Sequence, residues 1–238
     1  MSVSVCLRPH YLLCAPSGEI GAWRKTSCDL RGLDICFEVY VYTVYMKGEN
    51  TSERIALAAR KLLEAEGAEA VTMRRVAAAV KITAMAVYRH YADRDALLEV
   101  LADRGFTELA ERLEKVRLQG DLDTRMRKVL NVNLDFALEQ PRLFELMFLR
   151  MRKGARKFPR DFVAGKSPTA NQFAELVAEG MKGGVFYKGD VWEIAFESGA
   201  LLQGLVMLYL GGRVDASEQE FRKICHRAMG RYVDGIRK

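Results

Sequence analysis

The sequence predicts an all-α protein, with an N-terminal helix-turn-helix domain of three helices and a C-terminal helical domain. Two observations carry this prediction. Apolar residues recur at helical spacing in every readable segment after residue 46, and no convincing alternating strand pattern or internal repeat appears there. With 238 residues, half of them hydrophobic, the chain can bury a sizeable core. We expect residues 46–95 to form the first domain and residues 96–238 the second.

Residues 1–45 differ from the rest of the chain. Four of the five cysteines lie here, and the four basic residues balance the four acidic ones, so the whole net charge of +6 belongs to residues 46–238. The segment has no helical periodicity, and residues 39–45 are rich in Val and Tyr, which favour strands. The cysteines are Cys6, Cys14, Cys28 and Cys36.

Three interpretations of residues 1–45 compete. A signal peptide is disfavoured because the apolar stretch at residues 11–15 is short and poorly placed. A metal site remains open, although seven or thirteen residues separate successive cysteines, unlike the tight pairs of zinc sites. We favour the third interpretation, in which Met46 is the native start and residues 1–45 are a mis-assigned start or a poorly ordered extension.

The first predicted helix covers residues 51–66. Thr51 or Ser52 provides its N-cap, and Gly67 ends it. Its apolar stripe consists of Ile55, Ala58, Ala59, Leu62 and Leu63. This helix is expected to support the helices that follow it.

Residues 71–91 read as two short helices joined by a turn of three or four residues. Thr72 caps the first, which runs to Val80, and Thr83 begins the second, which reaches Tyr91. Alanines along both helices let them cross closely, as in a helix-turn-helix whose second helix enters the DNA major groove. An ordinary helical hairpin with a solvated basic face is the alternative.

Charge favours a nucleic-acid partner for this hairpin. Between residues 72 and 94 five basic residues oppose one acid, Asp93. We expect Thr83, Ala84 and Met85 to reach base edges, and the others to reach phosphates, with Arg94 as a clamp. The candidate DNA-binding residues are Thr72, Arg75, Lys81, Thr83, Ala84, Met85, Tyr88, Arg89, His90 and Arg94.

Residues 54–106 resemble the DNA-binding domain of the tetracycline-repressor-like (TetR) transcription regulators. The matching pieces are R-I-A-L-A-A-R-K-L-L-E-A-E-G, V-T-M-R-R-V-A-A-A-V, K-I-T-A-M-A-V-Y-R-H-Y and A-D-R-D-A-L-L-E-V-L. Lys81 stands where the family usually has Gly in the turn. A non-Gly residue at positive φ costs about 1 kcal/mol, so either the turn is altered or the strain is tolerated.

The resemblance implies a cytoplasmic homodimer that binds a palindromic double-stranded DNA operator. It also implies a small-molecule effector that releases the protein, so we expect a repressor. The alternative function is a helical small-molecule-binding or scaffolding protein that does not bind DNA. In the family the last two long helices form the dimer contact, here residues 191–210 and 217–237.

The predicted helices after the helix-turn-helix end at Gly or Pro breaks. A loop rich in Lys, Arg, Gly and Pro covers residues 152–166, and no apolar run reaches the roughly 18 residues that span a bilayer, so no membrane is expected. The expected helices cover residues 93–118, 122–140, 141–151, 167–182, 191–210 and 217–237.

Methionine and aromatic side chains in this part suit an irregular apolar pocket, although plain core packing is the alternative for each of them. Gln203, inside an apolar helix, requires a polar partner from a ligand, a second protomer or a local hydrogen bond. The candidate ligand-binding residues are Met126, Phe136, Phe144, Met147, Phe148, Met151, Phe173, Met181, Trp192, Phe196 and Gln203.

No pattern of catalytic residues supports an enzyme. His10, His90 and His226 are widely separated, and no nucleophile elbow, phosphate-binding loop or dinucleotide-binding glycine pattern occurs. We therefore predict no catalytic residues, no metal ligands and no cofactor.

Overall fold

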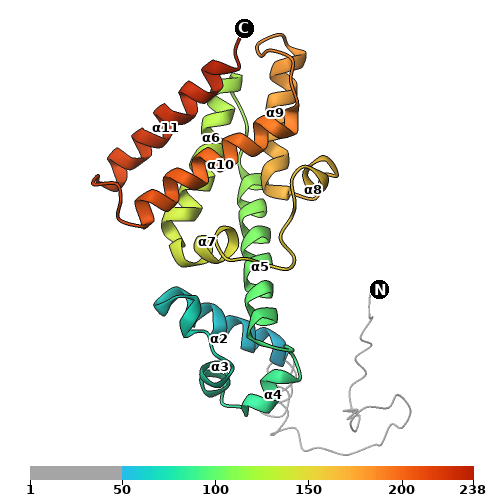
Figure 1. Cartoon of the computed structure of the whole chain (residues 1–238), viewed down its shortest axis with the longest axis vertical. Helices are drawn as coiled ribbons and strands as arrows, with labels where there is room; N and C mark the ends of the chain where they lie inside the picture. Colours follow the sequence, from blue (N-terminus) through green and yellow to red (C-terminus); the bar gives the residue numbers. More distant parts are fainter. Residues whose placement is uncertain (1–49) are drawn as a thin grey trace, which may run out of the picture. The chain divides into compact units, whose positions relative to one another are not determined.

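The computed structural model describes residues 50–238, and the predictions made for residues 1–45 lie outside them. In this part of the chain the structure is all-helical, which confirms the predicted fold class, with one isolated bridge between Phe186 and Arg237. The helices (Figure 1) are α2 (Thr51–Glu66), the 3-10 helix η1 (Ala68–Ala70), α3 (Met73–Val80), α4 (Ala84–Tyr88), α5 (Arg94–Lys115), α6 (Leu122–Glu139), α7 (Pro141–Phe148), α8 (Arg160–Val163), α9 (Pro168–Lys182), α10 (Val191–Leu210) and α11 (Glu218–Gly235).

Local capping explains most of the helix starts. The hydroxyls of Thr72 and Thr83 accept hydrogen bonds from backbone N–H groups three residues later, at 3.3 and 3.2 Å. Asp93 and Asp121 cap α5 and α6 in the same way, at 2.7 and 2.8 Å. These bonds satisfy N–H groups that the helix leaves unpaired, so these boundaries follow from the sequence alone.

The helix α5 is continuous from the helix-turn-helix into the C-terminal helices (Figure 1). Its N-terminal half buries Leu97, Leu98 and Leu101, which belong to the same core as α2 to α4. The predicted boundary after residue 95 therefore falls inside this helix.

A close crossing of α5 and α7 depends on Gly105. A Cβ at this position would lie 2.5 Å from the sulfur of Met147 and 3.0 Å from Cδ2 of Leu143. Such distances leave no room for a side chain, so Gly105 is required for packing. The sequence alone indicates only that glycine weakens a helix.

The remaining helices surround α5 and α6. Helix α9 packs against α5, α6 and α10, and α11 packs against α6 and α10 (Figure 1). The short helix α8 lies in the segment predicted as loop, and α4 ends at Tyr88 rather than at Tyr91. A four-residue helix carries too little periodicity to be visible in the sequence.

The apolar helix α10 is only partly covered. Of its residues only Ala195, Ser198 and Val206 are buried, whereas Phe196, Met207 and Leu208 are each more than 40% exposed. By length and composition alone this helix could also cross a membrane, but one such helix does not indicate a membrane protein, because core helices of soluble proteins share these properties. Its apolar side is therefore available for a partner.

Candidate DNA interface and ligand cavity

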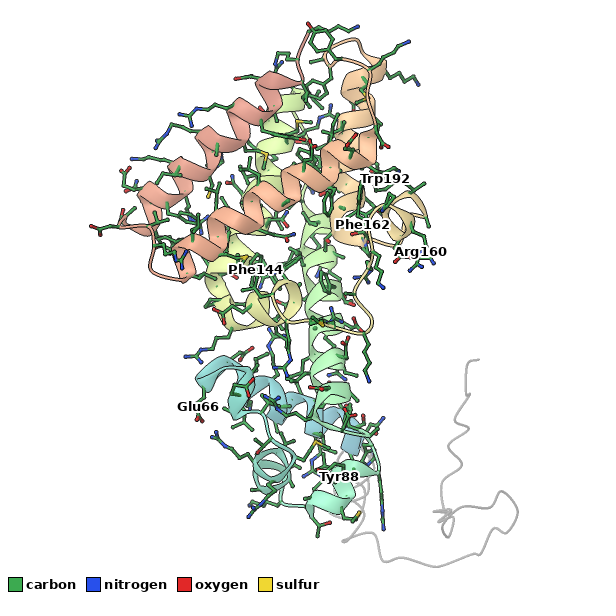
Figure 2. All side chains as sticks on the ribbon, in the orientation of Figure 1. Glu66, Tyr88, Phe144, Arg160, Phe162 and Trp192 are labelled. Carbon is green, nitrogen blue, oxygen red and sulfur yellow. The ribbon has the colours of Figure 1, made fainter. Side chains whose placement is uncertain are left out.

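Helix α4 presents its side chains to solvent. Met85 is 68% exposed and Tyr88, labelled in Figure 2, is 47% exposed, while Val87 on the opposite side is fully buried against the other helices. Ala84 is half-buried at the start of the helix. A short helix held by one buried side and leaving the other free has the form required to enter a groove.

The turn between α3 and α4 contains the strained residue anticipated at Lys81. Its φ of 58° and ψ of 45° are left-handed, and it is the one non-glycine residue with positive φ in the described part of the chain. Its N–H donates to the carbonyls of Ala77 and Ala78, which closes the end of α3. The strain is therefore tolerated and the turn keeps its shape, with the Lys81 side chain exposed.

Arg75 is less available than its charge alone suggests. Its guanidinium forms a bidentate ion pair with Glu66 at the end of α2, with one hydrogen bond of 2.9 Å. Arg75 holds the pKa of the Glu66 carboxyl below its ordinary value through this hydrogen bonding. The pair is exposed, so the arginine could exchange the carboxylate for a phosphate at low cost. Thr72 serves as a helix cap.

Arg94 does not have the geometry of a phosphate clamp, which corrects the role expected from the sequence. Its Nε donates to the carbonyl of Val71 at 2.7 Å, and its Nη2 donates to the carbonyl of Ala68 at 2.7 Å. Glu69 lies 3.1 Å from the same guanidinium. These bonds tie the start of α5 to the segment before α3.

The residues after α4 divide into a buried and an exposed group. Tyr91 is 6% exposed, and its hydroxyl donates to the carbonyl of Ser52 at 3.0 Å. Arg89 and His90 are exposed and form no ion pair within the described part of the chain. The free basic groups next to α4 are therefore Lys81 and Arg89, together with Arg74 on α3.

A cavity of about 320 Å³ lies among the C-terminal helices, with walls from α5, α6, α7, α9, α10 and the α7–α9 connection. Five of the candidate ligand-binding side chains line it, namely Met147, Phe148, Phe173, Phe196 and Gln203. Gln203 thus faces the cavity rather than an internal polar partner. A space of this size bounded by apolar and a few polar groups is typical of small-molecule sites.

The other six candidates lie elsewhere, and the structure does not support them as cavity residues. Phe136 and Phe144 are buried in the core, and Met151 is 97% exposed. Met181 and Trp192 pack against the core without reaching the cavity. Met126 lines a second, more open hollow of about 350 Å³ between α6 and α11. Residue type alone did not distinguish these positions from the cavity residues, because the way the helices cross determines which side chains face the cavity.

Sequence reasoning missed most of the residues that line the cavity, including Phe106 of α5 and a group from one connecting segment. Arg152, Arg156, Phe162 and Ser167 come from the connection between α7 and α9. Phe162, on α8 (labelled in Figure 2), meets Phe196 edge to face with ring centroids 5.7 Å apart. The sequence shows this segment as a loop rich in basic residues, and nothing in its pattern indicates that it covers a cavity.

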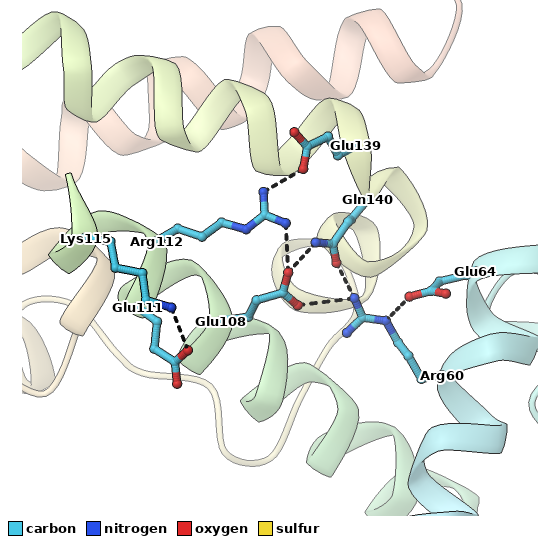
Figure 3. Close-up of polar contacts among 8 residues, drawn as sticks. All are labelled: Arg60, Glu64, Glu108, Glu111, Arg112, Lys115, Glu139 and Gln140. Atoms are coloured by element: carbon cyan, nitrogen blue, oxygen red, sulfur yellow. Dashed lines mark hydrogen bonds and ion pairs between the residues drawn. The ribbon is translucent and has the colours of Figure 1, made fainter.

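A polar network joins the helix-turn-helix domain to the C-terminal helices (Figure 3). Arg60 of α2 hydrogen-bonds to Gln140 at the end of α6 and lies 3.4 Å from Glu108 of α5. Arg112 connects Glu108 at 2.9 Å to Glu139 at 2.7 Å. Burial would raise the pKa of Glu108, but bonds from Gln140 and Arg112 hold it below its ordinary value. The network therefore fixes α5 relative to both domains.

Two family models match the chain. The one described as bacterial regulatory proteins, tetR family, matches residues 55–101, and the one described as tetracyclin repressor-like, C-terminal domain, matches residues 126–232. No curated protein matches the sequence.

Solved structures share the fold. A protein of unknown function from Rhodococcus sp. RHA1 is 24% identical, with 79% of this chain and 96% of that chain covered and a TM-score of 0.65. The TetR family transcriptional regulator PfmR from Thermus thermophilus is 18% identical, with coverage of 79% and 98% and a TM-score of 0.57. A TetR variant from Acinetobacter baumannii AYE in complex with minocycline is 19% identical, with coverage of 76% and 93% and a TM-score of 0.55.

Proposed function

Because the chain belongs to the tetR family of bacterial regulatory proteins, we propose that it represses transcription by binding a palindromic operator as a homodimer. A small molecule in the C-terminal cavity releases it. The observation that carries this proposal is the continuity of α5. This one helix is tied by Arg94 to the helix-turn-helix and lines the cavity with Phe106. A ligand against Phe106 therefore acts on the element that orients α4.

The DNA-binding surface consists of α4 and the basic residues beside it. Met85 and Ala84 supply contacts with base edges, and Tyr88, Lys81, Arg89 and His90 supply contacts with phosphates. The exposure of Met85 and Tyr88 and the free charges of Lys81 and Arg89 support these roles. We assign Arg74 to the phosphate contacts as well, because it is exposed and has no ion pair within the described residues.

The dimer contact is formed by α10 and α11. A second protomer would cover Met207 and Leu208, whose exposure is unfavourable in water. Gly204 supports this arrangement, because a Cβ there would meet no atom of its own protomer within 4 Å. Two copies related by a twofold axis would present two α4 helices to two half-sites, as a palindrome requires.

Regulation follows from a difference in affinity between two states. The effector must bind the conformation that does not fit the operator more tightly than the one that does. A coupling of about 1–3 kcal/mol, typical for such systems, would weaken operator binding about 5- to 150-fold. The protein represses transcription rather than activating it, and it acts in the cytoplasm.

The deciding experiment is a gel shift with the DNA upstream of the protein's own coding sequence, with random DNA of the same length as control. Tighter binding to the upstream DNA supports the regulator. Binding that is absent, insensitive to salt, or equal for the upstream and the random DNA would favour the alternative, a helical small-molecule-binding or scaffolding protein.

A further inference from the structure

The charges that line the cavity are all of one sign. Two arginines, Arg152 and Arg156, line it, and none of the lining residues is acidic. The neutral polar groups that face the cavity come from Asn133, Ser167 and Gln203, among others. Whether nearby carboxylates neutralise these two arginines therefore determines the charge of the molecule that the cavity attracts.

Arg152 is already neutralised. Its side chain is 5% exposed, its Nε donates to Glu99 at 3.0 Å, and its Nη2 lies 2.6 Å from Asp103. The backbone N–H of Lys153 also donates to Glu99 at 2.9 Å. Two carboxylates of α5 thus balance this guanidinium, which fixes the connecting segment to α5 and leaves little charge for a ligand.

Arg156 has no such partner. Among the described residues it forms no ion pair, and its guanidinium carbon lies 5.0 Å from the centre of the Phe106 ring. Stacking on this ring positions the group at the cavity wall while its charge stays uncompensated. An arginine held in this way keeps its N–H donors free for an anionic oxygen.

The N-terminus of α9 adds a second source of positive potential. Ser167, Thr169 and Ala170, at the first turn of this 15-residue helix, line the cavity. Ser167 is 5% exposed, and its hydroxyl forms no hydrogen bond with the described residues and does not cap the helix. A hydroxyl without a partner, on a residue that lines the cavity next to the positive end of a helix dipole, is suited to an anion.

Aromatic side chains form much of the apolar wall. Phe106 and Phe148 meet edge to face with ring centroids 5.2 Å apart, and Phe162 and Phe196 meet in the same way at 5.7 Å. Ring edges and faces at such angles accommodate a flat aromatic molecule well.

We propose that the effector is an aromatic anion, a molecule of one or two aromatic ring systems that carries a carboxylate or sulfonate. Its rings lie among Phe106, Phe148, Phe162 and Phe196. Its charge is neutralised by Arg156 and by the Ser167 hydroxyl at the start of α9. This inference rests on the proposed role of the cavity as the effector site.

The test compares two probes with one skeleton. 1-Anilinonaphthalene-8-sulfonate carries an anionic group, and N-phenyl-1-naphthylamine lacks it. Fluorescence titration of the full chain gives the affinity and stoichiometry of both. We expect the sulfonate to bind more tightly, with one site per protomer. Arg156→Gln should weaken its binding about fivefold at low salt, and Ser167→Ala should weaken it about threefold, with the neutral probe unaffected.

A matched control is Arg213→Gln, which removes the same charge from an exposed position outside the cavity and should leave both affinities unchanged. If Arg156→Gln weakened the binding of both probes equally, or if the neutral probe bound as tightly as the sulfonate, the effector would not be an anion. The cavity would still be a small-molecule site. If neither probe bound, the inference would be wrong, and the result would also count against the cavity as the effector site. The gel shift tests DNA binding independently of all these outcomes.

Discussion

The Nε of Arg94 donates a hydrogen bond of 2.7 Å to the carbonyl oxygen of Val71, so the first residue of α5 is joined to the segment that leads into α3. A residue at this place in the sequence could equally well face DNA. The bond to Val71, together with the one to Ala68, assigns Arg94 to the stability of the domain rather than to the phosphate backbone.

The first prediction separates stability from DNA contact. Arg94→Ala should lower the free energy of unfolding by about 2 kcal/mol, because two hydrogen bonds from a charged donor are lost. Arg89→Ala, at an exposed position, should change stability by less than about 0.5 kcal/mol but reduce the salt slope of DNA binding by about one unit. Urea unfolding measures the free energy of unfolding, and salt titrations measure the salt slope of DNA binding. If Arg94→Ala reduced the salt slope at unchanged stability, the phosphate role would be restored.

The second prediction concerns which residues read sequence. Met85→Ala should change the affinity for upstream DNA relative to random DNA, by about 1–3 kcal/mol if the methionine contacts a base edge. Tyr88→Phe removes a hydroxyl suited to phosphate and should weaken both complexes equally. Competition titrations with the two DNA fragments provide the ratio of the affinity for upstream DNA to that for random DNA. A similar change of ratio in both variants would contradict this division of roles.

The third prediction concerns the dimer. Gly204→Arg should produce monomers in sedimentation experiments, because it introduces a charge on α10 at a position where a Cβ meets no atom of its own protomer within 4 Å. Ala178→Arg adds the same side chain at an exposed position of α9 and should remain dimeric. A dimer in both variants would place the contact on other helices.

The fourth prediction tests the crossing of α5 and α7. Gly105→Ala should cost about 1–3 kcal/mol, because its methyl group would overlap Met147 and displace that side chain at the cavity wall. Binding of both naphthalene probes should weaken as well. Gly230→Ala, in α11, meets no atom within 4 Å and should stabilise the protein by up to about 1 kcal/mol. Equal effects of the two substitutions would show that helix propensity alone matters.

The fifth prediction concerns pH. The hydrogen bond from Arg160 and that from the Lys157 N–H lower the pKa of Asp161 from 3.8 to about 2. A lowered pKa means that the stabilisation is fully present above about pH 4 and is lost as the pH falls through about 2. Asp161→Asn should therefore loosen the α8 segment at pH 7, with a difference from the wild type that shrinks toward pH 2. Hydrogen exchange of amides 157–166 measures it, and a difference independent of pH would exclude the carboxylate as its cause.

The starts of α3, α4 and α5 follow from local sequence. Thr72, Thr83 and Asp93 cap helices through hydrogen bonds to N–H groups three residues away, and these bonds depend on local chain geometry alone. The left-handed turn at Lys81 lies where the family resemblance placed a glycine, and of the two alternatives the strained turn is the one observed.

Tertiary packing set the roles that depend on residues distant in the chain. Arg94 reaches carbonyls more than twenty positions earlier, and Met151 is exposed while Phe162 covers the cavity. Similar side chains at similar spacing can face the core, a cavity or solvent, because the crossing of helices, set here by contacts such as Gly105 on Met147, decides which direction each one faces.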